Sequence, residues 1–128
     1  MHPSTFAEPL DAARKYGTDD VCRLAGLSYR TVDYWVRRGV ISPEIAANGS
    51  GTSRRFTAEQ VQEFRLAAAL RRLGVLLDEI GVLVAAARSA VGACLIWTGT
   101  DVEWANSAQV VERVAELGGA AVVLTPAR

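Results

Sequence analysis

Apolar residues recur at helical spacing in four segments of the first 90 residues, which predicts a helical N-terminal part. The first helix is expected to have Thr18 as its N-cap and to end at Gly26. The second helix, over residues 28–38, is expected to be capped by Ser28 and to end at Gly39. Because so few residues separate these two helices, the pattern predicts a helix-turn-helix.

Two further helices are predicted before residue 90. Thr57 and Gln60 have the spacing of a capping box, so they predict the start of a third helix, which should end near Gly74. The helical period then continues into a fourth helix, and four of its apolar residues share one face: Leu77, Ile80, Val84 and Ala87.

Short apolar runs replace the helical period in the last third of the chain. Residues 93–97 and the alternating residues 102–105 predict a hairpin, and a helix capped by Ser107 precedes a last strand over residues 120–124. Because the first strand is apolar on both faces, we expect it in the middle of an all-antiparallel sheet. The last strand would then form an apolar edge, which predicts a homodimer through residues 91–125.

The expected fold class is therefore α+β. A winged helix-turn-helix with four helices and a two-stranded wing should be followed by a small β-β-α-β domain. In these terms residues 1–15 form a flexible tail, residues 16–90 the winged helix-turn-helix domain, and residues 91–128 the small domain for dimerisation or sensing.

The second helix has one apolar and one polar face. At about 100° per residue, Val32 and Trp35 fall on the same side, which should be buried. Arg30, Tyr34 and Arg37 fall on the opposite side. An arginine can bind guanine through two hydrogen bonds, and a tyrosine hydroxyl can bind a phosphate oxygen. The exposed face of this helix is therefore expected to enter a DNA groove.

A second candidate DNA contact follows this helix. Turn-forming residues fill positions 48–53 and lead into Arg54, Arg55 and Phe56. This pattern predicts a two-stranded wing that Phe56 anchors to the core and whose two arginines reach the sugar-phosphate backbone. The segment lacks the glycine spacing and the lysine of a P-loop, which argues against nucleotide binding.

Charge is distributed unevenly along a chain of zero net charge. Residues 1–74 have eleven basic and eight acidic side chains and so carry +3, and residues 75–128 carry −3. The same excess of +3 lies within residues 28–57 alone. This concentration indicates a basic patch for nucleic acid, with a merely solvated arginine face as the alternative.

Composition excludes several other classes of protein. With 50% hydrophobic and 22% charged residues, the chain is not globally disordered. Its longest apolar run, residues 91–97, is too short to span a bilayer, and residues 1–14 are not a signal peptide, so we expect a soluble, cytoplasmic protein without a membrane partner.

Cys22, Cys94 and His2 are too few and too dispersed for a metal site, and both cysteines are expected to be reduced core thiols. We expect no cofactor and no enzymatic activity, because no set of catalytic side chains is visible.

The order of these elements and their motifs resembles the DNA-binding domain of MerR-type transcription regulators over residues 16–125. The motifs that carry the resemblance are Ser28-x-Arg30-Thr31-Val32, Asp33-Tyr34-Trp35-x-Arg37-x-Gly39, Gly39-Val40-Ile41-x-Pro43 and Gly49-Ser50-Gly51-x-x-Arg54-x-Phe56. The second and fourth are similar to an actinobacterial subgroup whose small C-terminal domain also has a hairpin, a helix and a strand. Many members have a Ser or Thr cap just before the fourth helix, where Leu77 stands here. The long dimerising helix and the metal-binding cysteines of the metal sensors are absent, so metal sensing is not implied.

The resemblance implies a sequence-specific transcription regulator that binds double-stranded DNA as a homodimer, with helix 28–38 in the major groove. It also suggests RNA polymerase as a partner. The expected DNA-binding residues are Ser28, Tyr29, Arg30, Thr31, Asp33, Tyr34, Arg37, Arg38, Arg54 and Arg55. Two alternatives stay open: an excisionase-like recombination directionality factor, and a protein-interaction or ligand-sensing module.

Overall fold

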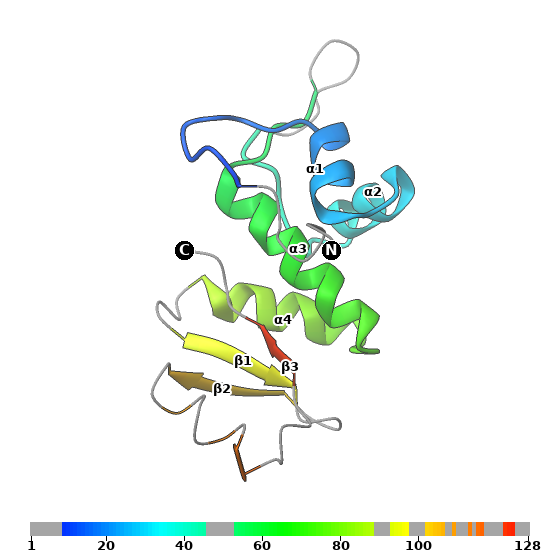
Figure 1. The fold of residues 1–128 in the computed structure, drawn as a ribbon. Helices are drawn as coiled ribbons and strands as arrows, with labels where there is room; N and C mark the ends of the chain where they lie inside the picture. Colours follow the sequence, from blue (N-terminus) through cyan, green and yellow to red (C-terminus); the bar gives the residue numbers. More distant parts are fainter. Residues whose placement is uncertain are drawn as a thin grey trace, which may run out of the picture.

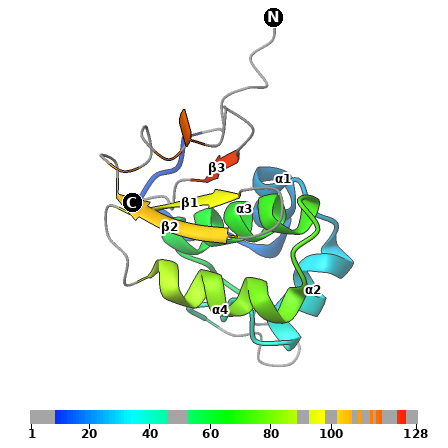
Figure 2. The ribbon, with the colours of Figure 1, turned by 90° about the horizontal axis from the view of Figure 1, so that it is seen from below.

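The computed structural model describes residues 9–45, 53–88, 93–97, 102–106, 109, 113, 115–116 and 122–124. In these ranges four helices come first along the chain and three short strands follow (Figure 1). The helices α1 and α2 lie at one end of the molecule and the strands lie at the other. Figure 2 views the molecule from the strand end. The chain thus has the predicted order of helices followed by strands.

The first helix, α1, spans Thr18–Ala25, and its N-cap is Gly17. The prediction that Thr18 is the cap is therefore wrong by one residue. The reason is that the backbone N–H of Gly17 donates to Asp20 Oδ2 at 3.0 Å, so the carboxylate in the first turn reaches back to the residue before Thr18. Gly26 ends the helix at φ 68°, a left-handed conformation that favours glycine, as predicted.

The second helix, α2, spans Tyr29–Arg37 and packs against α1. The predicted cap is confirmed, because Ser28 Oγ accepts a hydrogen bond from the backbone N–H of Thr31 at 3.1 Å. Gly39, at φ 77°, turns the chain out of the helix. The two helices and the short turn between them form the predicted helix-turn-helix.

The third helix, α3, spans Ala58–Arg72 and packs against both α1 and the fourth helix, α4, which spans Leu77–Ala87. The capping box of α3 is confirmed: Gln60 N–H donates to Thr57 Oγ1 at 3.1 Å, and Thr57 N–H donates to Gln60 Oε1 at 3.0 Å. The N-cap of α4 is Leu76, one residue before the expected position, and no side chain caps this helix. Among the described residues, no helix is both long and apolar enough to cross a membrane.

Three aromatic rings join α2, α3 and the segment before α3 in one core. Trp35 is 4% exposed, and its ring lies parallel to that of Phe64, with 6.5 Å between the ring centroids. Phe56 meets Phe64 edge-on at 5.3 Å, and neither phenylalanine is exposed. The predicted burial of Trp35 and the predicted anchoring role of Phe56 are both confirmed.

The residues just before α1 are attached to this core. Leu10 packs against it, and the backbone N–H of Asp11 donates to the Tyr16 hydroxyl at 2.9 Å. Lys15 forms an ion pair with Glu44 at 2.7 Å. The described part of the predicted tail therefore contacts the helical part, whereas residues 1–8 lie outside the described ranges.

The strands β1 (Ala93–Trp97), β2 (Val102–Asn106) and β3 (Val122–Leu124) form an antiparallel sheet in the order β2-β1-β3. This is the order expected from the apolar character of the first strand. Ile96 and Ala105 are buried but do not belong to the core of the helical part. Most of the predicted helix after Ser107 lies outside the described residues, which include only four helical positions of it: 109, 113, 115 and 116.

Candidate nucleic-acid interface

The outer face of α2 has the predicted composition. Arg30, Tyr34 and Arg37 are exposed, whereas Val32 and Trp35 on the opposite side are buried. The helix therefore buries its apolar stripe and presents two guanidinium groups and a phenol to solvent. This arrangement has the charge and the hydrogen-bond donors that a DNA groove requires.

Arg38, at the C-cap of α2, connects this face to α4. Its Nη1 donates to the Tyr34 hydroxyl at 3.0 Å, and its Nη2 contacts Asp78 Oδ1, also at 3.0 Å. The guanidinium carbon lies 5.7 Å from the centroid of the Tyr34 ring. Because Asp78 is 89% exposed, this ion pair is a surface contact of small energetic value, but it orients both side chains.

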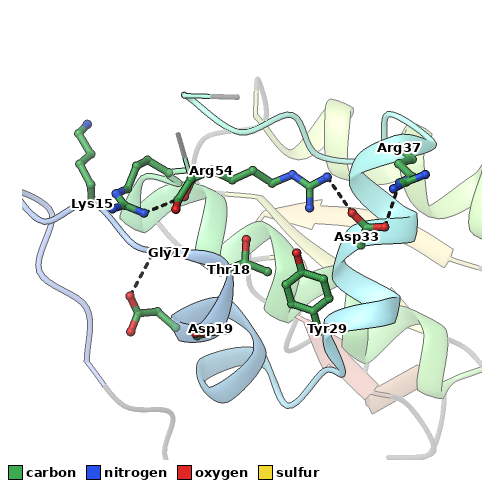
Figure 3. Close-up of a pocket in the computed structure, with 11 residues that line it drawn as sticks. Lys15, Gly17, Thr18, Asp19, Tyr29, Asp33, Arg37 and Arg54 are labelled. Carbon is green, nitrogen blue, oxygen red and sulfur yellow. Dashed lines mark hydrogen bonds and ion pairs between the residues drawn. The ribbon is translucent and has the colours of Figure 1, made fainter. Parts of the chain in front are cut away.

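Asp33 lies between two arginines (Figure 3). Arg54 Nη2 donates to Asp33 Oδ1 at 2.7 Å, and Arg37 Nε donates to Asp33 Oδ2 at 2.9 Å. The hydrogen bond from Arg54 lowers the pKa of the Asp33 carboxyl below its usual range; the positive charges of both arginines act in the same direction, and partial burial acts against them. Asp33 is therefore ionised at neutral pH.

A groove of about 770 Å³ runs between the start of α1, the outer side of α2 and the residues that lead into α3 (Figure 3). Its lining combines four basic and three acidic side chains with the exposed ring of Tyr29. The residues that line it are Lys15, Gly17, Thr18, Asp19, Asp20, Tyr29, Asp33, Arg37, Ser53, Arg54 and Arg55.

The structure describes only the base of the predicted wing. Ile45 and Arg55 form an isolated antiparallel bridge, with hydrogen bonds of 3.2 and 2.9 Å, and Tyr16 and Phe56 form another. The tip, residues 46–52, lies outside the described ranges. The described residues here form two isolated bridges, and the two-stranded wing stays a prediction. We call residues 53–56 the wing base.

The wing base separates the two arginines that were expected to act together. The Arg54 side chain is only 15% exposed and is bound to Asp33. Arg55 is exposed, and its Nη1 donates to the carbonyl oxygen of Arg54 at 3.1 Å. Arg55 thus lines the groove with an exposed side chain, whereas Arg54 links the wing base to α2.

The other predicted site residues lie at the start of α2. Ser28 and Thr31 bind each other, because Ser28 Oγ donates to Thr31 Oγ1 at 2.9 Å and also accepts from the Thr31 backbone. They serve as the cap of the helix. Tyr29 is 59% exposed at the same end and, like Arg30 beside it, faces solvent.

The sequence prediction omitted the residues that α1 contributes to the groove. Lys15 and Gly17, just before α1, and Thr18, its first residue, line the groove together with Tyr29 (Figure 3). A signal was present, since Lys15 is a basic residue just before the start of a predicted helix. That signal became specific only once α1 was placed beside α2.

Comparison with protein families gives a match over residues 16–87, more than half of the chain, to the MerR HTH family regulatory proteins. Two curated relatives are uncharacterized HTH-type transcriptional regulators, Rv1830 of Mycobacterium tuberculosis and Mb1861 of Mycobacterium bovis. Each is 33% identical over 70 residues, which make up 54% of this chain and 31% of the relative. The aligned part of the chain therefore spans only about a third of the length of these relatives.

Two solved structures are also similar. A MerR-family transcriptional regulator from Bacillus cereus has a TM-score of 0.50 at 12% identity, over 83% of this chain and 66% of that one. HiNmlR, a MerR family regulator lacking the sensor domain and solved bound to promoter DNA, has a TM-score of 0.49 at 19% identity, over 84% and 67%. The first shares the fold with this chain. With the family match over residues 16–87, the chain belongs to the MerR HTH family of regulatory proteins.

Proposed function

We propose that this protein is a sequence-specific DNA-binding transcription regulator whose helix α2 enters the major groove. The observation that carries the proposal is the outer face of α2, where Arg30, Tyr34 and Arg37 are exposed opposite a buried Val32 and Trp35. Among the described residues, Arg30 has no hydrogen-bond or ion-pair partner. Its five N–H donors are therefore available to a base edge or a phosphate. Membership of the MerR family supports this assignment.

The groove beside α2 fits the sugar-phosphate backbone next to the bases that α2 would read. Arg55 and Lys15 are among the basic side chains that line it and can contact phosphate oxygens. On this proposal Arg55 is the wing-base residue that contacts phosphate. Arg54 binds Asp33 and makes no contact with the DNA. A regulator bound at a promoter would also meet RNA polymerase, which we propose as its protein partner.

Binding of the full-length chain to duplex DNA at increasing salt concentration tests this proposal. We expect a linear fall of log K with log salt, and we expect Arg55→Ala to reduce the slope by about 1 while weakening binding to cognate and random duplexes alike. Arg88→Ala is the matched control, since it removes the same charge from a residue paired with Glu63 outside the groove. An unchanged slope in Arg55→Ala would remove the wing base from the interface, and a wild-type chain that binds no duplex at low salt would refute DNA binding altogether.

We further propose that residues 91–125 join two copies of the chain. The support is the position of β3 at an edge of the sheet, where its outer backbone groups can pair with a second strand. A two-fold dimer would present two α2 helices to half-sites about 34 Å apart, one turn of DNA.

Analytical ultracentrifugation tests the dimer. We expect the full-length chain to be a dimer at micromolar concentration and a chain ending at Ala90 to be a monomer, because the truncation removes the whole sheet. The circular dichroism of the truncated chain should retain the helical signal of α1 to α4. A monomeric full-length chain, or a folded truncated chain that still dimerises, would contradict the proposal.

A further inference from the structure

The ion pairs of Asp33 place a negative charge inside a surface that the proposed function assigns to DNA. A carboxylate cannot bind phosphate, and it lowers the affinity of its neighbours for any polyanion. Asp33 is nevertheless on the side of α2 that faces the groove, with only 23% of its side chain exposed. Within this surface it contacts two arginines, Arg37 and Arg54.

The atoms used in the two contacts differ. Arg37 uses Nε to bind Asp33 Oδ2, and its side chain is 73% exposed. Both terminal nitrogens, Nη1 and Nη2, therefore remain available, and these are the pair that can bind guanine O6 and N7 together. Because Asp33 and Arg37 are four residues apart, one turn of α2 brings them to the same face.

Arg54 holds the other oxygen of the same carboxylate. Its contact of 2.7 Å to Oδ1 comes from the wing base, 21 residues away in the sequence, and its side chain is mostly buried. Asp33 thus cannot rotate without breaking a contact to a second element. A carboxylate fixed at both oxygens can in turn fix the plane of the Arg37 guanidinium, which a single flexible pair on a helix surface would not do.

We propose that Asp33 determines the DNA specificity of this protein by orienting Arg37 as a base-reading arginine, with Arg54 fixing the carboxylate from the wing base. This rests on the proposed function and names the positioning residues within it. Asp33 itself makes no DNA contact in this arrangement. Its negative charge also penalises binding to random duplexes, in which Arg37 gains phosphate contacts but no paired base contact.

In vitro selection from a pool of randomised DNA duplexes tests the proposal with the full-length chain. The wild-type protein, Asp33→Asn and Arg37→Lys are compared by the duplexes that each enriches. Arg37→Lys keeps the charge but cannot bind a guanine with two parallel hydrogen bonds. We expect both variants to lose the preference at the same base pair of the enriched site, by roughly 5- to 150-fold in relative affinity. Asp33→Asn should bind a scrambled duplex at least as tightly as the wild-type chain does.

Two further variants separate orientation from charge and from folding. Glu63→Gln removes the same charge as Asp33→Asn from a residue paired with Arg88 outside the groove, and it should enrich the wild-type site. Arg54→Lys keeps the positive charge at the wing base but not the geometry of the guanidinium, so it should weaken the preference at the same base pair. If Asp33→Asn does not fold by thermal melting, Arg54→Lys carries the test.

The possible outcomes are distinct. A folded Asp33→Asn that enriches the wild-type site with unchanged selectivity would overturn the role of Asp33 and leave DNA binding by α2 intact. Loss of preference at a base pair that Arg37→Lys does not affect would also overturn it. A wild-type chain that enriches no sequence would refute the proposed function on which this inference rests.

Discussion

Replacement of Trp35 by alanine is expected to destabilise the folded chain by about 3–5 kcal/mol, the range for loss of a buried tryptophan and the cavity that remains. Trp35 is 4% exposed and stacks on Phe64, which in turn meets Phe56. The cavity would therefore open where α2, α3 and the wing base meet. Rearrangement of these three elements into the cavity is limited, since each is fixed by its own helix cap or backbone bridge.

Urea unfolding followed by circular dichroism measures this effect. Tyr34→Ala is the matched control, because it removes the neighbouring aromatic residue of the same helix, which is 48% exposed, and it should change the free energy of unfolding by less than about 1 kcal/mol. If Trp35→Ala unfolded like the wild-type chain but lost DNA binding, Trp35 would belong to the DNA interface and not to the core.

Arg30→Ala is expected to cost about 1–3 kcal/mol of specific DNA binding while leaving the fold unchanged. The side chain is exposed at the start of α2, where a helix in the major groove meets base edges. The alanine variant lacks both hydrogen bonds that the Arg30 guanidinium would make to one guanine. The loss should therefore fall on the cognate duplex more than on a random one.

Fluorescence anisotropy with the selected duplex and with a scrambled duplex measures both affinities. Arg30→Lys distinguishes the kind of contact, since a lysine can replace an arginine at a phosphate but lacks the planar guanidinium that binds both acceptors of one guanine in a fixed geometry. Equal losses of affinity for both duplexes would show that Arg30 contacts the sugar-phosphate backbone of the DNA and not a base. Unchanged affinity and selectivity in folded Arg30→Ala would show that this face of α2 is not the reading surface.

The features predicted correctly depend on residues close together in the sequence. Ser28 and Thr57 act as caps because each bonds a backbone N–H three residues ahead. The burial of Trp35 follows from the period of one helix, and the central position of β1 follows from its apolar run. Thr18 and its neighbour Gly17 are both residue types found at helix N-caps. The hydrogen bond from the Gly17 N–H to Asp20 decides that Gly17 is the cap of α1.

The contact between Asp33 and Arg54 could not be predicted in the same way. Arg54 was expected to reach the DNA backbone together with Arg55, because both follow a polar loop and local sequence does not distinguish them. Their different exposure depends on how the wing base lies against α2, which is set by the burial of Phe56 in the common core. The wing tip and most of the helix after Ser107 lie outside the described residues, so these predictions stay untested.

The separation of α1 and α2 from the sheet has a consequence for how the protein would find DNA (Figure 1). The part of the sequence that contains α1, α2 and α3 carries +3 and the remainder carries −3, so a chain without net charge still has an electric dipole along its length. In the field of a polyanion such a dipole experiences a torque that turns the α2 end forward before contact. Orientation of this kind raises the fraction of productive collisions at low ionic strength, and most of it is screened at physiological ionic strength, where the screening length is about 8 Å.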